Sequence, residues 1–494
     1  MKHKHFLLIL FFLTNITCVN AAIIDGACGA NLTWTLNTKD SILTIEGTGE
    51  MTSTPWTTYN SYIAYASLPE GLTNIGNSAF ENSKDLRSIV IPCSVTTIGD
   101  RAFYACEKLS SLTIPNNVVS IGDNAFMCCR TITTITIPEN VNHIGRQVFT
   151  SCTNLKTAIF NNEIKSFGDC AFSNCQNLES VSLPIGLTVI SGSTFSDCYK
   201  LSSIDIPNTV TTIGGMAFMD CISLASVSIP DSVTSIDYRA FARCTALQSI
   251  EIGESVTSLG KAVFEKCTSL TTVIWKAKFC SNFTQDSSPF DFYVVGTYDS
   301  QYNYSIGHQI TSFVLGEKVR HIPAYLLRAT LNLESISIPN SVKSIGKYAF
   351  NGSAIHSINI PDSVNSIGEY AFSDCANLST VILGKSIINI GKHIFRDCPI
   401  KNLTVYAETP PEGGLESGIS NTTCKLYVPE DYLNVYTNTI WWEDFMDIRP
   451  IQDQTTAIEN SPSYQRGFNK LFHNGQIFIL RGDKTYTLTG QEVK

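Results

Sequence analysis

Apolar and polar positions recur with a fixed period of 23 residues over most of the chain. A phenylalanine marks each period, and nine copies follow one another in strict register: Phe80, Phe103, Phe126, Phe149, Phe172, Phe195, Phe218, Phe241 and Phe264. A constant period of this length is typical of a solenoid, in which each repeat buries its apolar face only against its neighbours. The sequence therefore predicts a stacked coil rather than the two or three globular domains usual for 494 residues.

Each unit follows one apolar pattern, L-x-x-I-x-I-P-x-x-V-x-x-I-G-x-x-A-F-x-x-C. In a representative unit, the alternation of Leu112 and Ile114 predicts a short strand with both side chains inward. Pro115 ends this strand because it has no amide N–H to donate to a ladder. We expect residues 118–121 to form a second, shorter extended segment, and Gly122 to turn the chain.

The Ala-Phe-x-x-Cys part of each unit predicts a single helical turn. Ala125, Phe126 and Cys129 would share one face of that turn, because residues three or four apart are neighbours on a helix. The phenylalanine would fill the centre of the coil, and stacked rungs would place one ring on the next. The pattern therefore predicts about 14 rungs, each with short parallel strands and one helical turn.

The period is interrupted once, after Val273. We interpret the following stretch as one divergent rung with Phe283 and Phe290 inward, carrying an extra loop over residues 291–308. The next unit has Leu327 in place of the phenylalanine, and the series then resumes at Phe350, Phe372 and Phe395.

The segment before the repeats has a different pattern. Alternating apolar and polar residues over 32–36 and 42–45 predict a β-hairpin. Because the terminal repeats of a solenoid need caps, we assign residues 23–67 to an N-terminal β cap and residues 68–405 to the repeats.

The segment after the repeats predicts a second cap. We assign residues 406–452 to it, and expect a helix over 430–440 and the indoles of Trp441 and Trp442 to seal the last rung. Residues 453–467 are polar and predict a linker, and residues 468–494 predict a small β tail with Asn-Gly and Gly-Asp turns.

The first 22 residues have the pattern of a secretory signal peptide. Two lysines precede an apolar run over 6–13, and a small-residue cleavage site ends at Ala21. A bacterial lipoprotein would instead be cut just before Cys18, which leaves two alternatives open: a cleaved chain, or one tethered by an N-terminal lipid at Cys18. No later run is long and apolar enough to span a bilayer. We therefore expect any attachment to a membrane to be through the lipid at Cys18.

Composition and charge narrow the class of partner. Charged residues make up 16% of the chain, the formal net charge is −9 and the pI is about 5.4. An acidic chain without a lysine or arginine stripe is a poor candidate for nucleic-acid binding. We therefore expect no nucleic-acid partner.

The cysteines follow the repeat. Ten of the 17 stand three residues after the repeat phenylalanine: Cys106, Cys129, Cys152, Cys175, Cys198, Cys221, Cys244, Cys267, Cys375 and Cys398. One recurring position implies one recurring slot, so we expect a buried ladder of free thiols, although a rung spacing of roughly 5 Å would not by itself exclude disulfides. No pair has C-x-x-C spacing and the histidines are scattered, so we expect no metal site and no cofactor.

The strand positions that point outward form the candidate binding surface. The residue between the last two inward apolar positions is Thr113, Thr136, Ile159, Ser182, Asp205, Ser228, Glu251 and Ile274 in successive units. Two positions earlier, nearly every unit has Ser or Thr. One interpretation is a flat, hydroxyl-rich docking surface, and the other is that a crowded parallel sheet simply tolerates short β-forming residues.

Two acids in this column raise the question of catalysis. Asp205 and Glu251 are two rungs apart, so roughly 10 Å would separate them, near the spacing of an inverting glycosidase pair. A solvated sheet surface would raise the pKa of neither acid, and we expect neither an aromatic sugar platform nor a cleft beside them. We therefore expect no enzyme activity.

The inserted loop is the second candidate binding site. It contains Tyr293, Tyr298, Tyr302 and Tyr304. Tyrosine-rich loops suit recognition because rigid amphipathic rings supply contact area at low entropic cost. The alternative is a loop that folds onto the solenoid through its own aromatic residues.

Taken together, these segments resemble a known family. The stretches IPNSVKSIGKYAF and IPDSVTSIDYRAFARCTALQSIE look like the BspA-type leucine-rich repeat of surface proteins from host-associated anaerobic bacteria. CGANLTWTLNTKDSILTIEGTG and CKLYVPEDYLNVY resemble the caps of that family, and GQIFILRGDKTYTLTGQEVK resembles tails that act in sorting or anchoring. The resemblance implies a right-handed α/β solenoid, export, surface display and binding, in some members to host matrix proteins, and it implies no catalytic residues.

The leading hypothesis is an exported protein, secreted or associated with the cell surface or outer membrane, that acts as a macromolecular binding or adhesion module. Its partner would be a host or bacterial surface protein or a glycan, bound on the sheet face and the 291–308 loop. The alternatives are a structural spacer or self-assembling surface protein and, less favoured, a glycan-directed enzyme.

Overall fold

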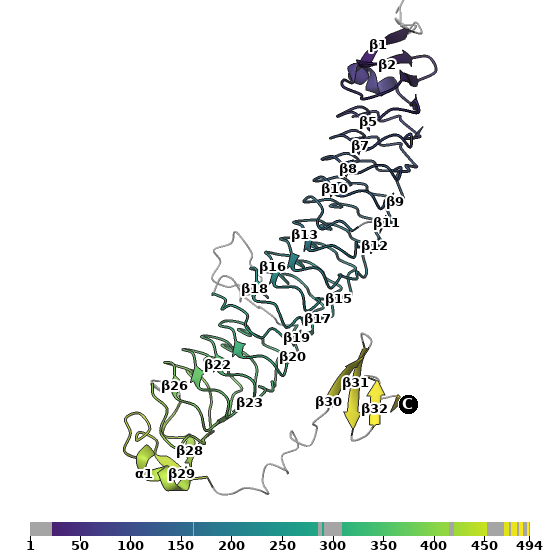
Figure 1. The fold of residues 1–494 in the computed structure, drawn as a ribbon. Helices are drawn as coiled ribbons and strands as arrows, with labels where there is room; N and C mark the ends of the chain where they lie inside the picture. Colours follow the sequence, from purple (N-terminus) through teal and green to yellow (C-terminus); the bar gives the residue numbers. More distant parts are fainter. Residues whose placement is uncertain are drawn as a thin grey trace, which may run out of the picture.

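The computed structural model describes residues 22–161, 163–284, 289–290, 309–413 and 419–451, and the backbone of four strands between 469 and 493. The repeats form a parallel-strand β-solenoid of about 17 turns with a period of about 23 residues, an elongated rod in Figure 1. Most turns add one strand to a first ladder, one shorter strand to a second ladder, and one tight corner that holds the phenylalanine.

The first ladder contains the L-x-x-I-x-I segments. Its strands are β4 (Tyr65–Ser67), β6 (Ser88–Ile89), β9 (Thr134–Ile137), β11 (Thr157–Phe160), β12 (Ser180–Ser182), β15 (Ser226–Ser228), β17 (Ser249–Ile252), β19 (Thr272–Trp275), β20 (Ser312–Leu315), β23 (Ser357–Ile360), β25 (Thr380–Leu383), β27 (Asn402–Val405), β28 (Lys425–Val428) and β29 (Asp447–Pro450).

The second ladder contains the V-x-x-I segments, as the spacing predicts. Its strands are β5 (Asn74–Ile75), β7 (Thr97–Ile98), β8 (Ser120–Ile121), β10 (His143–Ile144), β13 (Val189–Ile190), β14 (Thr212–Ile213), β16 (Ser235–Ile236), β18 (Ser258–Leu259), β21 (His321–Ile322), β22 (Ser344–Ile345), β24 (Ser366–Ile367) and β26 (Asn389–Ile390).

The divergent rung is absorbed within a single turn. Thr272 of β19 pairs directly with Ser312 of β20, so the insertion lies between two neighbouring strands of the first ladder. Phe283 and Phe290 are both buried, as predicted. The Phe290 ring stacks on Phe264 with centroids 5.5 Å apart, so the aromatic column continues into this rung.

A stack of phenylalanine rings forms the core. From Phe80 to Phe264, successive centroids lie 5.1 to 5.9 Å apart with interplanar angles of at most 18°. Leu327 takes the same buried position in the rung after that of Phe290. Since each ring contacts rings of the rungs on both sides, no rung closes its core alone.

The predicted helical turn is wrong. Asn124 and Cys128, two residues on either side of Phe126, have positive φ angles of 57° and 63°. The amides of Asn124, Phe126 and Cys128 donate to carbonyl oxygens of the next rung, at Arg146, Val148 and Thr150. A helix would need these amides for its own carbonyls, so the corner is a run of tight turns that forms a third ladder between rungs.

The number of turns exceeds the predicted 14 because both ends continue the first ladder. At the N-terminal end, β1 (Ile23–Gly29), β2 (Leu32–Asn37) and β3 (Ile42–Gly47) are antiparallel, but β3 pairs in parallel with β4. A 3-10 helix, η1 (Pro55–Tyr62), lies between β3 and β4 and buries Trp56. At the other end, β28 and β29 are parallel to β27.

The helix of the C-terminal end is shorter than predicted. It consists of η2 (Glu430–Tyr432) and α1 (Leu433–Tyr436). Trp442 is buried and meets Tyr436 edge-on at 5.2 Å, whereas Trp441 is 44% exposed. One indole therefore seals the last rung, not two.

The last strands form a separate antiparallel sheet. They are β30 (Asn469–His473), β31 (Gln476–Arg481), β32 (Lys484–Thr487) and β33 (Glu492–Val493), paired in chain order. The predicted signal peptide, the Cys18 anchor, the 453–467 linker and the 291–308 loop lie outside the described residues.

Candidate functional site

The outward column of the first ladder lies where the sequence places it. Thr113, Thr136, Ser182, Asp205 and Ser228 are exposed, and Glu251 is half-buried. Neighbouring members are in register across the strands, with Ile159 opposite both Thr136 and Ser182, and Ser228 opposite Glu251. These side chains therefore share one face of the rod, which we call the sheet face.

A column of hydroxyl groups runs beside them. Thr134, Thr157 and Ser180 are in register, and so are Ser226, Ser249 and Thr272. The Oγ of Ser180 donates to the Oγ1 of Thr157 at 3.4 Å. Short side chains over several rungs make this part of the face low in relief.

The first ladder is interrupted next to Asp205. The sheet β12-β11-β9 ends at β12, and the next sheet begins at β15, so the rung at residues 201–206 contains no strand. Its Ser202 carbonyl still accepts the Ala225 amide at 3.2 Å, which ties the rung to β15. Among the described residues, no backbone hydrogen bond joins the rung at 201–206 to β12, and these two rungs are separated on the sheet face.

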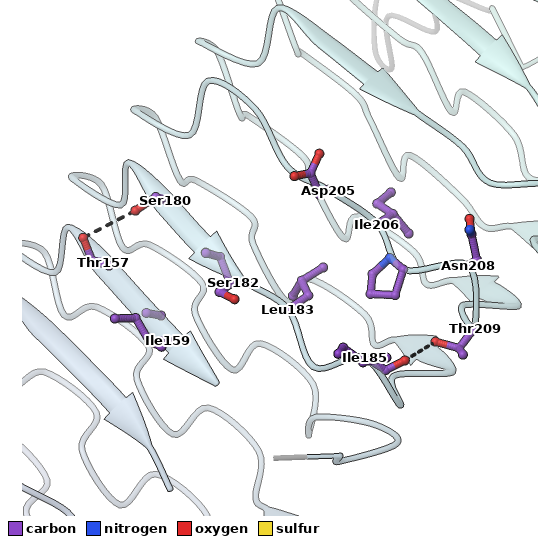
Figure 2. Close-up of a pocket in the computed structure, with 13 residues that line it drawn as sticks. Thr157, Ile159, Ser180, Ser182, Leu183, Ile185, Asp205, Ile206, Asn208 and Thr209 are labelled. Atoms are coloured by element: carbon purple, nitrogen blue, oxygen red, sulfur yellow. Dashed lines mark hydrogen bonds between the residues drawn. The ribbon is translucent and has the colours of Figure 1, made fainter. Parts of the chain in front are cut away.

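A hollow of about 640 Å³ occupies this gap (Figure 2). Its walls come from three consecutive rungs: Thr157–Ile159, Ser180–Leu183 with Ile185, and Asp205–Thr209. Figure 2 shows Asp205 and Ile185 toward opposite ends, with Leu183 and Ile206 between them, and Pro207 also lines the hollow. We call it the Asp205 hollow.

The apolar end of the hollow is held firmly. Ile185 is 81% exposed and follows a proline in the loop after β12. The hydroxyl of Thr209 lies 2.7 Å from the carbonyl oxygens of both Ile185 and Leu187, which ties this loop to the next. The position of Ile185 is therefore set by the neighbouring rung.

Ile185 can be recognised in the sequence by comparing one loop position between units, although the apolar repeat pattern does not include that position. At the position after the proline, other units have Asn116, Glu139, Asn208 and Asp231. An isoleucine at this exposed loop position is the exception. Ile185, Asn208 and Thr209 thus join the predicted Ser182 and Asp205 in one site.

The two candidate acids have different surroundings. The Glu251 carboxylate pairs with the Lys276 ammonium group. Asp205 has no ion pair within the part of the chain that the structure describes. The rung of Ser228 separates them, so they act as independent groups rather than as a pair.

A second hollow, of about 770 Å³, lies on the second ladder. Its lining includes His143, Arg146, Glu163 and Lys165. It borders the rung in which Phe167 stands where the preceding unit has Ile144. Its charged side chains are exposed and of both signs, so it favours no ligand charge.

Four aromatic rings form a column along the corner of the last rungs, and none of them is among the site residues predicted from the sequence. Tyr325, Tyr348, Tyr370 and His393 stack with centroids 5.0, 4.8 and 5.0 Å apart. The Lys347 ammonium lies 5.4 Å from the centroid of Tyr348 and pairs with Glu369 at 2.7 Å. A spacing of 22 or 23 residues, two positions before the phenylalanine, is the sequence signal for this column.

The predicted loop tyrosines, Tyr293, Tyr298, Tyr302 and Tyr304, lie outside the described residues. Within the described residues, no group of three or more His, Cys, Asp or Glu side chains could hold a metal ion. The same residues include no helix with the length and hydropathy needed to cross a bilayer.

The thiol ladder is buried and unpaired, as predicted. All ten repeat cysteines are free. The Sγ–H of each donates to the phenylalanine carbonyl of the preceding rung, for example Cys152 to Phe126 at 3.2 Å. Burial raises the pKa of the Cys152 thiol to about 12, so this side chain serves packing and not nucleophilic chemistry.

Comparison with known proteins extends these observations. A family model described as "BspA type Leucine rich repeat region (6 copies)" matches residues 57–179, 188–286 and 300–409. No curated protein matches the sequence.

Solved structures of leucine-rich repeat proteins are similar to this chain, and the first of them shares its fold. A leucine-rich repeat protein from Bacteroides ovatus is 22% identical with a TM-score of 0.53, over 85% of this chain and 98% of that one. A leucine-rich repeat protein from Eubacterium ventriosum is 22% identical with a TM-score of 0.39, over 77% and 96%. A leucine-rich cell surface protein from Faecalibacterium prausnitzii is 20% identical with a TM-score of 0.29, over 87% and 96%.

Proposed function

Because the chain belongs to the BspA-type leucine-rich repeat family, we propose that it is an exported binding module that docks a macromolecule on its sheet face. The observation that carries this proposal is the Asp205 hollow, which opens in a face rich in short, hydroxyl-bearing side chains. A low-relief surface with one recess suits a partner that covers several rungs and inserts one group. The cell surface is the expected location, and the predicted signal peptide supports export.

The partner class is a protein or glycan on a host or bacterial surface. The formal charge of −9 and the absence of a basic stripe argue against nucleic acid. Adhesion would follow from multivalent display of such modules on a cell.

The experiment is binding of the purified full chain to immobilised matrix proteins and to a glycan array. Thr136→Lys and Ser228→Lys place long cations on the sheet face at either side of the hollow. Thr211→Lys and Thr234→Lys are the matched controls, because both positions are exposed beside the second ladder. We expect the sheet-face pair to weaken binding at least about tenfold and the controls to leave it unchanged.

Equal loss in the control variants would place the partner on another surface and overturn the assignment of the site. The absence of any partner, together with association that grows with protein concentration in light scattering, would favour the second candidate.

That second candidate is a spacer that joins copies end to end. The C-terminal end exposes an apolar group in which Ile440 is 69%, Trp441 44% and Met446 77% exposed. At the other end, β1 is an edge strand, and Ile23 is 71% exposed. Exposed apolar side chains at an end of a rod favour association between ends.

A further inference from the structure

We propose that the Asp205 hollow takes the side chain of an arginine or lysine that a protein partner inserts between β12 and the following rung. This inference rests on the proposed function and specifies the partner's chemistry. The carboxylate at one end of the hollow would receive the cation, and the aliphatic wall toward Ile185 would contact the methylene stem.

The charge of Asp205 is the first argument. Glu251, the other acid of the outward column, pairs with Lys276, and Glu254 in the loop after β17 contacts both Lys278 and Lys318 at 2.8 and 2.9 Å. Asp205 is exposed and has no such partner among the described residues. Of the two acids in the outward column, Asp205 is therefore the one whose negative charge is available to pair with a cationic ligand.

The wall of the hollow is the second argument. Ile185 is 81% exposed, and Pro207 and the outer edges of the buried Leu183 and Ile206 also line the hollow. A long aliphatic stem with a cationic end matches this arrangement, because it buries its methylene groups while its charge reaches the carboxylate. An acidic side chain would meet repulsion from Asp205.

A sugar ligand fits the hollow less well. No aromatic ring lines the hollow, so a sugar ring would have no flat platform to stack against. A neutral ligand would also leave the charge of Asp205 without an opposite charge. The lining thus favours a basic side chain over a glycan.

The hollow is also built before any ligand arrives. The Thr209 hydroxyl holds the Ile185 loop through two carbonyl oxygens at 2.7 Å. Pro207 stiffens the opposite wall, because its ring fixes φ. A site that needs little ordering on binding loses less affinity to conformational entropy.

The experiment uses small probes and the full chain. Nα-acetylarginine methylamide is titrated by ligand-observed NMR, beside the citrulline compound, which keeps the shape and lacks the charge. Methyl glucoside serves as the sugar probe. We expect millimolar binding of the arginine probe, at least about tenfold weaker binding of the citrulline probe, and further weakening in 0.5 M salt.

Substitutions of Asp205 and Glu251, the two acids of the outward column, test whether Asp205 binds the cation. Asp205→Asn should weaken the arginine probe at least about tenfold, whereas Glu251→Gln, two rungs away and already paired, should leave it unchanged. Ile185→Ser should weaken it severalfold through loss of the apolar wall. Equal binding of both amino-acid probes, no binding at all, or equal effects of the two acid variants would overturn the proposal, and preference for the sugar would make the site a glycan site.

The experiments distinguish failure of the inserted-cation proposal from failure of the proposed function. If Asp205→Asn leaves a matrix-protein affinity intact while Thr136→Lys and Ser228→Lys abolish it, the docking face stands and the inserted cation is wrong. If none of these variants changes that affinity, the sheet face itself is wrong.

Discussion

The Sγ–H of Cys129 donates to the carbonyl oxygen of Phe103, one rung earlier, at 3.1 Å. Cys106 makes the same bond to Phe80, and Cys221 to Phe195. The thiol therefore fills a small apolar slot and also links consecutive rungs. This double role accounts for the recurrence of cysteine without disulfides.

Cys129→Ala should lower the free energy of unfolding by about 1 to 2 kcal/mol, because it removes one buried hydrogen bond and leaves a small cavity. Urea denaturation followed by circular dichroism measures the change. Cys93→Ala is the control, because Cys93 is exposed, and it should have no measurable effect. Equal effects of the two substitutions would contradict the proposed role of the buried thiol.

Alkylation should separate the cysteines by burial. At pH 8, iodoacetamide should label Cys93 within minutes and Cys152 or Cys267 only after unfolding, since burial raises the pKa of each of the latter thiols to about 12 and excludes the reagent. Peptide mapping by mass spectrometry gives the extent at each site. Fast labelling of Cys152 in the folded chain would show that the ladder opens readily.

The aromatic column should dominate stability. The Phe218 ring lies 5.5 Å from Phe195 and 5.1 Å from Phe241. Phe218→Ala should cost about 3 to 5 kcal/mol, through lost apolar burial and an unfilled cavity. Phe218→Leu should cost much less, because Leu327 fills the same position in the native chain. Similar costs for the two variants, measured by urea denaturation, would show that ring stacking, and not filling of the buried position, makes the main contribution.

The sequence predicts the core of this fold well and its corners poorly. The positions of Phe126 and Ile121 follow from periodicity, because one apolar slot recurs in each rung. The conformation of the corner does not follow from periodicity, because apolar residues spaced i, i+3 are compatible with both a helical turn and a tight turn. The choice depends on amides such as that of Phe126, which donates to Val148 in the next rung.

The candidate site is only partly predictable for a related reason. The exposure of Ser182 and Asp205 follows from strand alternation. The hollow lies where the rung at residues 201–206 has no backbone hydrogen bond to β12, and the repeat pattern does not predict which successive rungs lack such bonds. The loop position of Ile185 was the one local signal for it.

A histidine next to the insertion should make stability depend on pH. The Nε2 of His321 lies 2.7 Å from Oδ1 of Asn282, which also accepts the Ala324 amide at 2.9 Å. Because that oxygen only accepts, Nε2 carries the proton, and Nδ1 accepts from the Ser344 hydroxyl at 2.8 Å. Burial lowers the pKa of His321 below its usual value, so the folded chain favours the neutral ring.

The direction of the effect follows from this shift. Above the unfolded-state pKa of about 6.5, the ring is neutral in both states and its stabilising contacts are fully present. As pH falls from there through the lower folded-state pKa, the unfolded chain takes up the proton first, and stability is lost at up to about 1.4 kcal/mol per pH unit. Urea unfolding at pH 7.5 and pH 5 should therefore show a smaller pH dependence for His321→Gln than for the native chain. His143→Gln, at an exposed position of the second ladder, should retain the native dependence, and an unchanged pH dependence in His321→Gln would mean that another group is responsible.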